Sequence, residues 1–198
     1  MYTAKGLLNG DALFELTIFE GSDQMGCGMP YRSGMNADYM YCNAFSREIP
    51  SITRPLVSWL HDQDDDFLDG WDMARDDIDA RDFYPRVLLG EYMKSEFRDL
   101  CDAGRSAGHV INVLPRHQVH DITPTGTGMS LDIQTPHGKS VFTFDQVVVA
   151  TGHSWPSSPT LGQADLVSPW PYTNITDQPA GKIGVLGSSL SAIDVIVA

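Results

Sequence analysis

The stretch that decides the fold is Leu13-Phe14-Glu15-Leu16-Thr17-Ile18-Phe19-Glu20-Gly21-Ser22. Apolar side chains alternate along its first seven residues, which predicts a β-strand. The strand ends on the acid Glu20, and a Gly-Ser turn follows. In dinucleotide-binding folds an acid at the tip of the second strand holds the ribose hydroxyls, about 20 residues after a glycine loop. Glu20 is therefore a candidate nucleotide ligand, and a Glu in an ordinary surface turn is the alternative.

The residues before this strand predict the back half of a helix. Tyr2–Leu8 has a helical pattern and Asn9-Gly10 stops it, yet no N-cap residue or loop precedes it. Counting back about 20 residues from Glu20 reaches the very start of the chain. The implied glycine loop would therefore lie just before Met1.

Further along, the pattern predicts one long helix and then short strands. The helix covers Pro85–Cys101, and Gly104 is its expected stop. Before it, the segment 61–82 holds ten Asp in 22 residues and predicts a solvated acidic connection. After Gly108 the period changes to two. This predicts a strand and then a three-stranded meander, over His109–Val113, Gln118–Ile122, Ser130–Gln134 and Ser140–Phe144.

An apolar run near residue 150 predicts a strand at the centre of a parallel sheet. The strand covers Gln146–Ala150 and ends at Thr151 and Gly152. Parallel α/β folds bind ligands at the carboxyl edge of the sheet, which makes these two residues candidates. A buried strand followed by a simple turn is the alternative. The Pro- and Ser-rich stretch from His153 to Pro179 is interpreted as a linker.

The last 17 residues predict a second strand-turn-helix unit. Lys182–Leu186 is the strand, and the turn is Gly187-Ser188-Ser189-Leu190-Ser191-Ala192. This G-x-S-x-x-A form gives a tight turn, a small side chain beside a pyrophosphate and close packing of the helix on the sheet. The N–H groups and dipole of the helix N-terminus then favour phosphate. A plain β–α turn built from small residues is the alternative.

Composition excludes several classes of protein. The chain has 198 residues, 42% of them hydrophobic and 20% charged, as in globular proteins. With 13 Lys and Arg against 26 Asp and Glu the net charge is −13, which disfavours nucleic acid and anionic membrane surfaces as partners. Three scattered cysteines form no Cys-x-x-Cys pair and fit a reducing cytoplasm. We see neither an apolar run of membrane-spanning length nor a signal-peptide pattern.

Other groupings do not predict sites. His117 and His120 are three residues apart in a strand-like run and point to opposite faces, so we expect no metal there. Asp62, Asp64 and Asp66 mimic the start of a calcium loop, but the sixth and twelfth positions are Phe67 and Met73. No local hydrolase signature is present.

Taken together, the motifs resemble the FAD/NAD(P)-binding protein family, which is related to flavin-containing monooxygenases and pyridine-nucleotide-dependent flavoprotein reductases. The similarity covers nearly the whole chain in the right order. It rests on Ile18-Phe19-Glu20, Gly26-Cys27-Gly28-Met29-Pro30-Tyr31, Phe45-Ser46-Arg47-Glu48-Ile49-Pro50, Arg86-Val87-Leu88-Leu89-Gly90-Glu91-Tyr92, Ala150-Thr151-Gly152-His153 and Gly187-Ser188-Ser189-Leu190-Ser191-Ala192-Ile193-Asp194.

The resemblance implies roles for individual residues. Glu20 would hold the adenosine ribose of FAD, and the backbone near Val119 would face the adenine. Gly26 and Gly28 would let the chain pass close to the flavin, and Arg47 would contact a cofactor phosphate or the isoalloxazine. Thr151 and Gly152 would close over the pyrophosphate. The nicotinamide dinucleotide would be bound by Gly187, Ser188, Ser189 and Ser191.

The resulting expectation is an α/β protein with two domains. Residues 1–178 would form a partial Rossmann-like FAD-binding domain with an inserted antiparallel β-meander at about 116–145, lacking its first strand and glycine loop. Residues 179–198 would begin an NAD(P)-binding Rossmann domain. Because the phosphate cradle is missing, we expect this chain alone to bind FAD weakly or not at all.

The expected activity of the full-length protein is hydride transfer from NAD(P)H to FAD, and then reduction of O2 or a small substrate. The cofactor carries this chemistry, so no side chain is assigned as a catalytic acid, base or nucleophile. The alternatives are a non-catalytic nucleotide-binding or regulatory module and, less favoured, a single-Rossmann dehydrogenase. Monooxygenase and reductase are not distinguished, nor are NAD and NADP.

Overall fold

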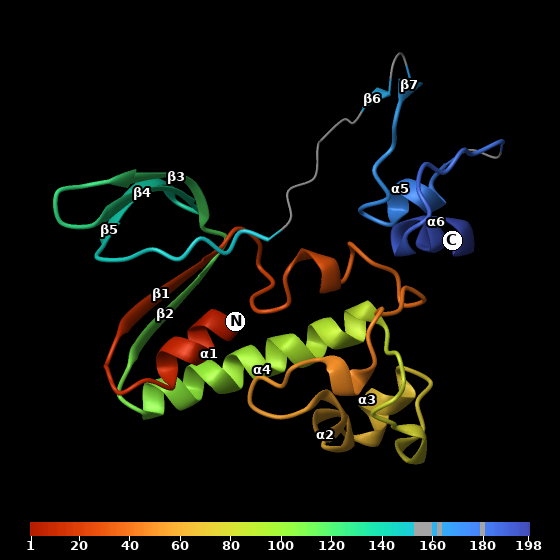
Figure 1. The fold of residues 1–198 in the computed structure, drawn as a ribbon, viewed down its shortest axis with the longest axis horizontal. Coiled ribbons are helices and arrows are strands. Elements are labelled where there is room, and N and C mark those ends of the chain that lie inside the picture. The colour runs from red at the N-terminus through yellow and green to blue at the C-terminus, as the bar shows by residue number, and fades with distance from the viewer. Residues whose placement is uncertain (153–159, 162–163, 179–180) are drawn as a thin grey trace. The chain divides into compact units, whose positions relative to one another are not determined.

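The computed structural model describes residues 1–152, 160–161, 164–178 and 181–198, and it divides into two compact units (Figure 1). Unit 1 comprises residues 1–26 and 94–152, and unit 2 comprises residues 27–93 and 153–198. The α-helices are α1 (Tyr2–Leu8), α2 (Leu56–His61), α3 (Asp65–Asp69), α4 (Arg86–Ser106), α5 (Thr173–Thr176) and α6 (Leu190–Val197), with 3-10 helices at Met29–Tyr31, Ser46–Glu48 and Arg75–Asp77.

Unit 1 contains a parallel strand pair packed against helices. β1 (Glu15–Glu20) pairs with β2 (Val110–Pro115) in a register that sets Glu20 opposite Pro115, which confirms both predicted strands. In Figure 1 the two strands lie side by side. A Cβ on Gly104 of α4 would stand 2.6 Å from Ile111 Cδ1 and 3.1 Å from Leu8 Cδ1. The bare glycine therefore lets α4 approach β2 and α1 closely.

The end of α4 differs from the prediction. Gly104 lies inside the helix, and the chain turns at Gly108, whose φ is +101°. Close packing holds Gly104 in helical conformation, whereas Gly108 supplies the left-handed backbone that ends helices.

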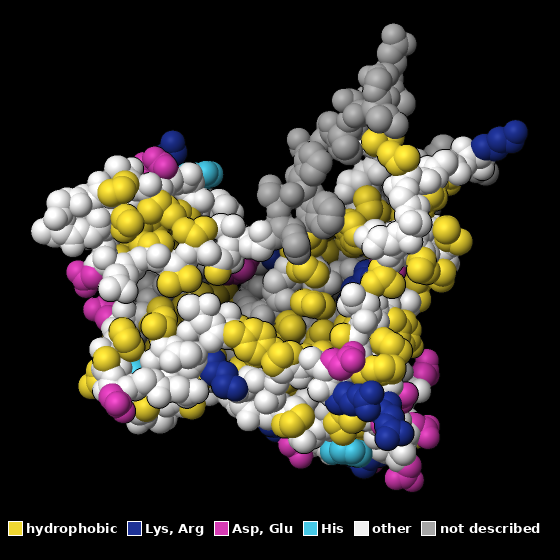
Figure 2. Space-filling view, in the orientation of Figure 1, with side chains coloured by type: hydrophobic (Ala, Val, Ile, Leu, Met, Phe, Trp, Pro, Cys, Tyr) yellow, Lys and Arg dark blue, Asp and Glu magenta, His cyan; other side chains and the backbone are white. Residues whose placement is uncertain are grey.

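An antiparallel sheet follows β2 in unit 1. Its strands are β3 (Gln118–Pro124), β4 (Met129–Thr135) and β5 (Gly138–Phe144), in the order β3-β4-β5. These strands include the three predicted ones, and β4 buries Leu131 and Ile133. Figure 2 shows hydrophobic side chains gathered over this sheet. That the sheet is an insertion within an FAD-binding domain stays a prediction.

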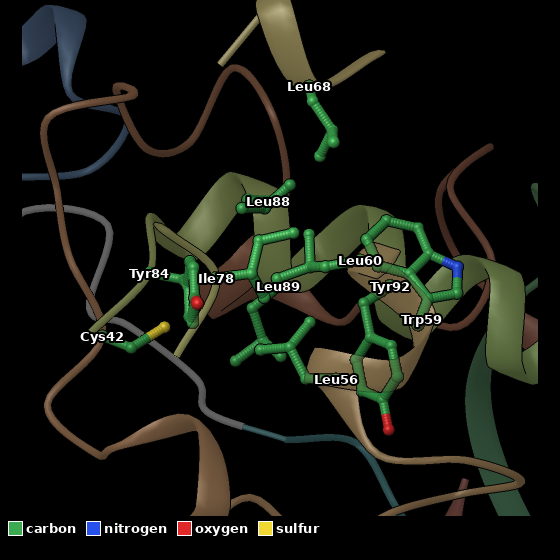
Figure 3. Packing of buried hydrophobic residues seen from close by; sticks show 10 residues of the cluster. All are labelled: Cys42, Leu56, Trp59, Leu60, Leu68, Ile78, Tyr84, Leu88, Leu89 and Tyr92. Atoms are coloured by element: carbon green, nitrogen blue, oxygen red, sulfur yellow. The ribbon is translucent and has the colours of Figure 1, made fainter. Parts of the chain in front are cut away.

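Unit 2 is built around the cluster of buried side chains in Figure 3. Trp59 of α2 packs edge-on against Tyr92 of α4 at 5.7 Å between ring centroids, and the Tyr92 hydroxyl donates to the Arg54 carbonyl at 2.7 Å. The cluster comprises Cys42, Leu56, Trp59, Leu60, Leu68, Ile78, Tyr84, Leu88, Leu89 and Tyr92.

The acidic segment 61–82 is more ordered than the predicted solvated connection. Asp64 caps α3 by accepting a hydrogen bond from the Phe67 N–H at 2.7 Å, and Leu68 and Ile78 reach the core. Figure 2 shows acidic and basic side chains next to one another over this part of unit 2. The many Asp residues correctly indicated that one face of the segment is exposed. They gave no sign that Leu68 and Ile78 are buried on the other face, because solvation of one face of a segment does not exclude burial of the other.

Two predicted strands are absent from the described part of the chain. Residues 146–150 and 182–186 have no regular secondary structure, and most of their apolar side chains are exposed, as at Val149 (67%) and Leu186 (73%). A strand needs a neighbouring strand for its backbone hydrogen bonds, and none of the described residues supplies one. The prediction of a central strand at Gln146–Ala150 and of a strand at Lys182–Leu186 is therefore wrong for this structure.

The predicted linker His153–Pro179 lies partly outside the described residues. Its described part contains the short antiparallel pair β6 (Thr160–Leu161) and β7 (Ala164–Asp165) and the helix α5. The Tyr172 N–H donates to the Met35 carbonyl at 3.1 Å, which ties the start of α5 to the rest of unit 2.

Candidate functional site

The tip of β1 presents a carboxylate in a fixed position. Glu20 ends the strand, and its Oε1 accepts hydrogen bonds from the N–H and the hydroxyl of Ser22 at 2.9 and 2.8 Å. The Glu20 carbonyl accepts the His117 N–H at 2.9 Å, which continues the sheet hydrogen bonding toward β3. The carboxyl ends of β1 and β2 lie together because the strands are parallel. Glu20 is thus an oriented, half-buried acceptor at the carboxyl edge of a parallel pair, the edge at which parallel α/β folds in general bind ligands.

An aromatic cluster forms around Phe19, the residue before Glu20, within unit 1. Phe19 meets Phe142 and Phe144 of β5 edge-on, with ring centroids 5.4 and 5.8 Å apart, and its ring lies 6.3 Å from that of His117. These contacts fix the end of β1 against the antiparallel sheet. They bring Glu20 near the start of β3, the strand that carries Val119.

The backbone at Val119 is irregular. A register shift separates Val119 from Asp121 in the pairing of β3 with β4. Bulges of this kind interrupt the hydrogen-bond ladder and redirect the backbone. The structure therefore brings together Glu20 and the Val119 segment, two of the residues that sequence analysis selected.

The glycine-rich loop has the backbone that only glycine adopts easily. Gly26 and Gly28 have φ of +88° and +71°, and a Cβ on Gly28 would have Pro30 Cδ as its nearest neighbour at 3.8 Å. Gly26 belongs to unit 1 and Gly28 to unit 2. Glycines in this conformation permit close approach of a ligand, and the role of Gly26 and Gly28 beside a cofactor stays a prediction.

The loop after Gly28 is fixed from inside. Asn36 is only 3% exposed, and its Nδ2 donates to the Pro30 carbonyl at 3.0 Å. Gly90 of α4 lets the Tyr31 backbone cross the helix, since a Cβ there would collide with the Tyr31 carbonyl. Burial raises the pKa of the Tyr31 hydroxyl, an effect that the charge of Arg86 partly opposes. This hydroxyl is therefore a neutral donor or acceptor at neutral pH.

Arg47 is an exposed cation held by an aromatic ring. Its guanidinium lies 5.2 Å from the centroid of the Phe45 ring, and its backbone N–H donates to the Ala80 carbonyl at 2.9 Å. Phe45 itself contacts Phe83 at 4.4 Å between centroids. The arrangement keeps a charge available to an anion, but no described contact joins Arg47 to Gly28.

The Gly187 turn leads directly into α6. Gly187 has φ of +124° with open space around it, and Ser189 is the N-cap residue of the helix. The Ser189 carbonyl accepts the Ala192 N–H at 2.8 Å, while Gly187, Ser188 and Ser189 are exposed and Ser191 is half-buried. The first N–H groups of a helix lack intrahelical acceptors, so this turn offers donors to an anion.

Thr151 and Gly152 are exposed, and Gly152 has φ of +71°. Because residues 146–150 form no strand, the described structure does not place these two residues at a sheet edge. Their predicted role over the pyrophosphate stays a prediction.

Sequence reasoning missed two features near these residues. Ser22 fixes Glu20, and a Ser two residues after an acid is a recognisable turn signal. Asp194 is a buried acid in the apolar helix α6, and its carboxylate pairs with Arg86 at 2.7 Å. A buried acid predicts some cationic partner, but a partner 108 residues away cannot be read from spacing.

The described residues contain no group of three or more His, Cys, Asp or Glu placed to hold a metal ion. Among the helices of the described chain, none is both long enough and apolar enough to cross a membrane.

The parallel β1–β2 pair, the antiparallel sheet and the helices make the described chain a mixed α/β structure that is consistent with a Rossmann-like nucleotide-binding domain. The family model described as FAD-NAD(P)-binding matches residues 1–154, and the chain belongs to this family. The resemblance seen in the sequence is thereby confirmed.

A relative from Escherichia coli strain K12, the uncharacterized protein YdhS, is 34% identical over 198 residues. The match covers 100% of this chain and 37% of the relative, so the chain spans little more than a third of that protein's length. No solved structure matches the chain.

Proposed function

We propose that the full-length protein is an FAD-dependent oxidoreductase that takes a hydride from NAD(P)H. Membership of the FAD-NAD(P)-binding family supports binding of a flavin or a pyridine nucleotide. The observation that carries the proposal is the oriented Glu20 carboxylate at the carboxyl end of the β1–β2 pair. A carboxylate at this edge suits the two adjacent hydroxyls of a ribose, each of which donates a hydrogen bond.

Each proposed FAD contact suits its role by its own chemistry or backbone, with Glu20, Val119 and Gly26 in unit 1 and Gly28 and Arg47 in unit 2. Glu20 would accept from the adenosine ribose, the irregular Val119 backbone would face the adenine, and Gly26 and Gly28 would admit the cofactor close to the main chain. Arg47 offers a positive charge to a phosphate or to the isoalloxazine. Thr151 and Gly152 are proposed to lie over the pyrophosphate.

The Gly187 turn is the proposed site for the nicotinamide dinucleotide. Its exposed Gly187, Ser188 and Ser189, together with Ser191, surround the start of α6, where a pyrophosphate meets N–H donors and the positive end of the helix dipole. Ala192 is buried, which allows the helix to pack closely as the motif requires.

The bound flavin supplies the redox chemistry by accepting a hydride from the nicotinamide and delivering electrons to O2 or to a small substrate. This chain's residues bind and orient. Glu20 and the turn fix the two nucleotides, and the neutral Tyr31 hydroxyl beside the Gly28 loop supplies a hydrogen-bonding group without charge. We also propose a cytoplasmic location, which the three buried free thiols support.

Anaerobic reduction of the full-length protein tests the proposal. The purified protein is loaded with FAD, and NADH or NADPH is added while the visible flavin absorbance is followed. Loss of the flavin band with one of the two nucleotides is expected. A protein that holds flavin but is bleached by neither nucleotide would support the alternative, a non-catalytic nucleotide-binding module. A protein that binds no flavin would refute the proposal.

A further inference from the structure

One ion pair in unit 2 joins α6 to α4. The Arg86 guanidinium donates to both carboxylate oxygens of Asp194, Nη1 to Oδ2 at 2.7 Å and Nη2 to Oδ1 at 3.4 Å. The two side chains are only 12% and 9% exposed. The pair differs in this from Arg54–Asp62 and Arg75–Asp65, whose carboxylates face solvent.

The pair is the main described attachment of α6. Only Ala192 and Asp194 of this helix are buried, while Ile193, Ile196 and Val197 are 51%, 73% and 64% exposed. Apolar packing therefore contributes little to holding the helix, whereas a buried carboxylate is strongly unfavourable without its cation. The position of α6 within unit 2 accordingly depends on Arg86.

Arg86 is itself held firmly. It begins α4, and its backbone N–H donates to the Met40 carbonyl at 2.8 Å. A forked guanidinium that binds both oxygens of one carboxylate also fixes the orientation of its partner, which a single point charge does not. Asp194 lies four residues after the first residue of α6, one turn from the Gly187 turn, so fixing Asp194 fixes the direction in which the helix N-terminus points.

We propose that the Arg86–Asp194 ion pair is the device that positions the Gly187–Ser191 turn for the nicotinamide dinucleotide. Both are positioning residues that act through the turn and need not touch the nucleotide. This inference rests on the proposed function of the turn. It adds a link between the nucleotide-binding helix and α4 that the G-x-S-x-x-A motif does not contain.

The test uses the full-length protein with two readouts, the dissociation constants of NAD(P)H and FAD and the amide hydrogen exchange of residues 190–197 without nucleotide. Asp194→Asn keeps the shape of the side chain and removes its charge. We expect about tenfold or greater weakening of NAD(P)H binding, an unchanged FAD dissociation constant and faster exchange in α6. Arg86→Lys keeps the positive charge and is expected to recover part of both effects. Asp62→Asn makes the same chemical change in an exposed pair and should leave both readouts at the wild-type values.

The outcomes separate this inference from the function on which it rests. Wild-type exchange in α6 and wild-type NAD(P)H affinity in Asp194→Asn would overturn the inference. Equal loss of FAD and NAD(P)H binding in Asp194→Asn and Arg86→Lys would also overturn it, because the pair would then support the whole fold. If the wild-type protein binds no NAD(P)H, the proposed function of the turn fails, and the exchange measurement still decides whether the pair anchors α6.

Discussion

Replacing Gly90 with alanine perturbs the place where α4 meets the loop that carries Gly28. A Cβ built on Gly90 would stand 3.1 Å from the Tyr31 carbonyl carbon and 3.4 Å from Tyr31 Cβ, and closer still to the carbonyl oxygen. The obstacle is mainly backbone, which cannot rotate away as the end of a side chain does. The loop or the helix must therefore shift.

The change in the free energy of unfolding expected for Gly90→Ala is the sum of two opposing effects. Alanine in a helix interior is favoured over glycine by about 1 kcal/mol. Overpacking a buried site costs about 1–3 kcal/mol, and a backbone obstacle belongs at the upper end. The net loss is about 2 kcal/mol, which lowers the melting midpoint by about 4–8 °C for a cooperative unit of about 150–250 residues that contains Gly90. Displacement of the Gly28 loop is also expected to weaken FAD binding.

Thermal unfolding of the full-length protein, with and without FAD, measures both effects. Gly6→Ala is the matched control, because Gly6 lies in α1 with nothing within 4 Å of an added Cβ, and this change should leave the midpoint equal or higher. The reasoning would be refuted if Gly90→Ala melted at or above the wild-type temperature, since the predicted collision would then be absent.

Three further substitutions test other parts of the structure. Gly187→Ala forces φ of +124° on a side-chain-bearing residue at a strain of about 1–3 kcal/mol, so NAD(P)H titration should show weaker binding. Burial raises the pKa of the Cys42 thiol from 9.0 to about 11. Between these pH values only the unfolded thiol ionises, so the free energy of unfolding falls by up to about 1.4 kcal/mol per pH unit. Urea titrations at about pH 8 and about pH 10 should show a smaller fall for Cys42→Ala than for the wild type. His109→Phe keeps the ring stacked on Phe14 but removes the Nδ1 that accepts the Phe14 N–H at 3.2 Å, and the urea midpoint should reveal a loss of about 1 kcal/mol.

Local pattern predicted the elements that are stabilised within the chain. The strand that ends at Glu20 and the antiparallel sheet β3-β4-β5 have alternating side chains, and both are present. Partners within the sheet are close in sequence, whereas Glu15 of β1 pairs with Val110 of β2, across all the helices from α2 to α4. The same apolar pattern at residues 146–150 and 182–186 predicted strands that the described structure lacks. Alternation and apolarity report which face a strand buries, but a strand exists only where another backbone completes its hydrogen bonds.

The candidate site was predictable to the extent that it depends on the backbone. Positive φ at Gly26, Gly28 and Gly187 follows from glycine at turn positions, as the motifs require. The contacts that fix these turns were not predictable. Gly90, for example, packs against the backbone of Tyr31, which is distant in sequence, and local composition does not indicate such a contact.

The FAD dissociation constant of the full-length Glu20→Gln protein tests most directly whether the tip of β1 is the cofactor site. It is compared with the wild-type constant and with that of Glu15→Gln, a change at the exposed start of the same strand. Hydrogen bonds to a charged group contribute about 1.5–3 kcal/mol, so loss of the charge at Glu20 is predicted to weaken FAD binding by about ten- to one-hundred-fold. Glu15→Gln should bind as wild type does. Equal FAD affinity in all three proteins, or no flavin bound by any of them, would contradict the claim that the tip of β1 is the cofactor site.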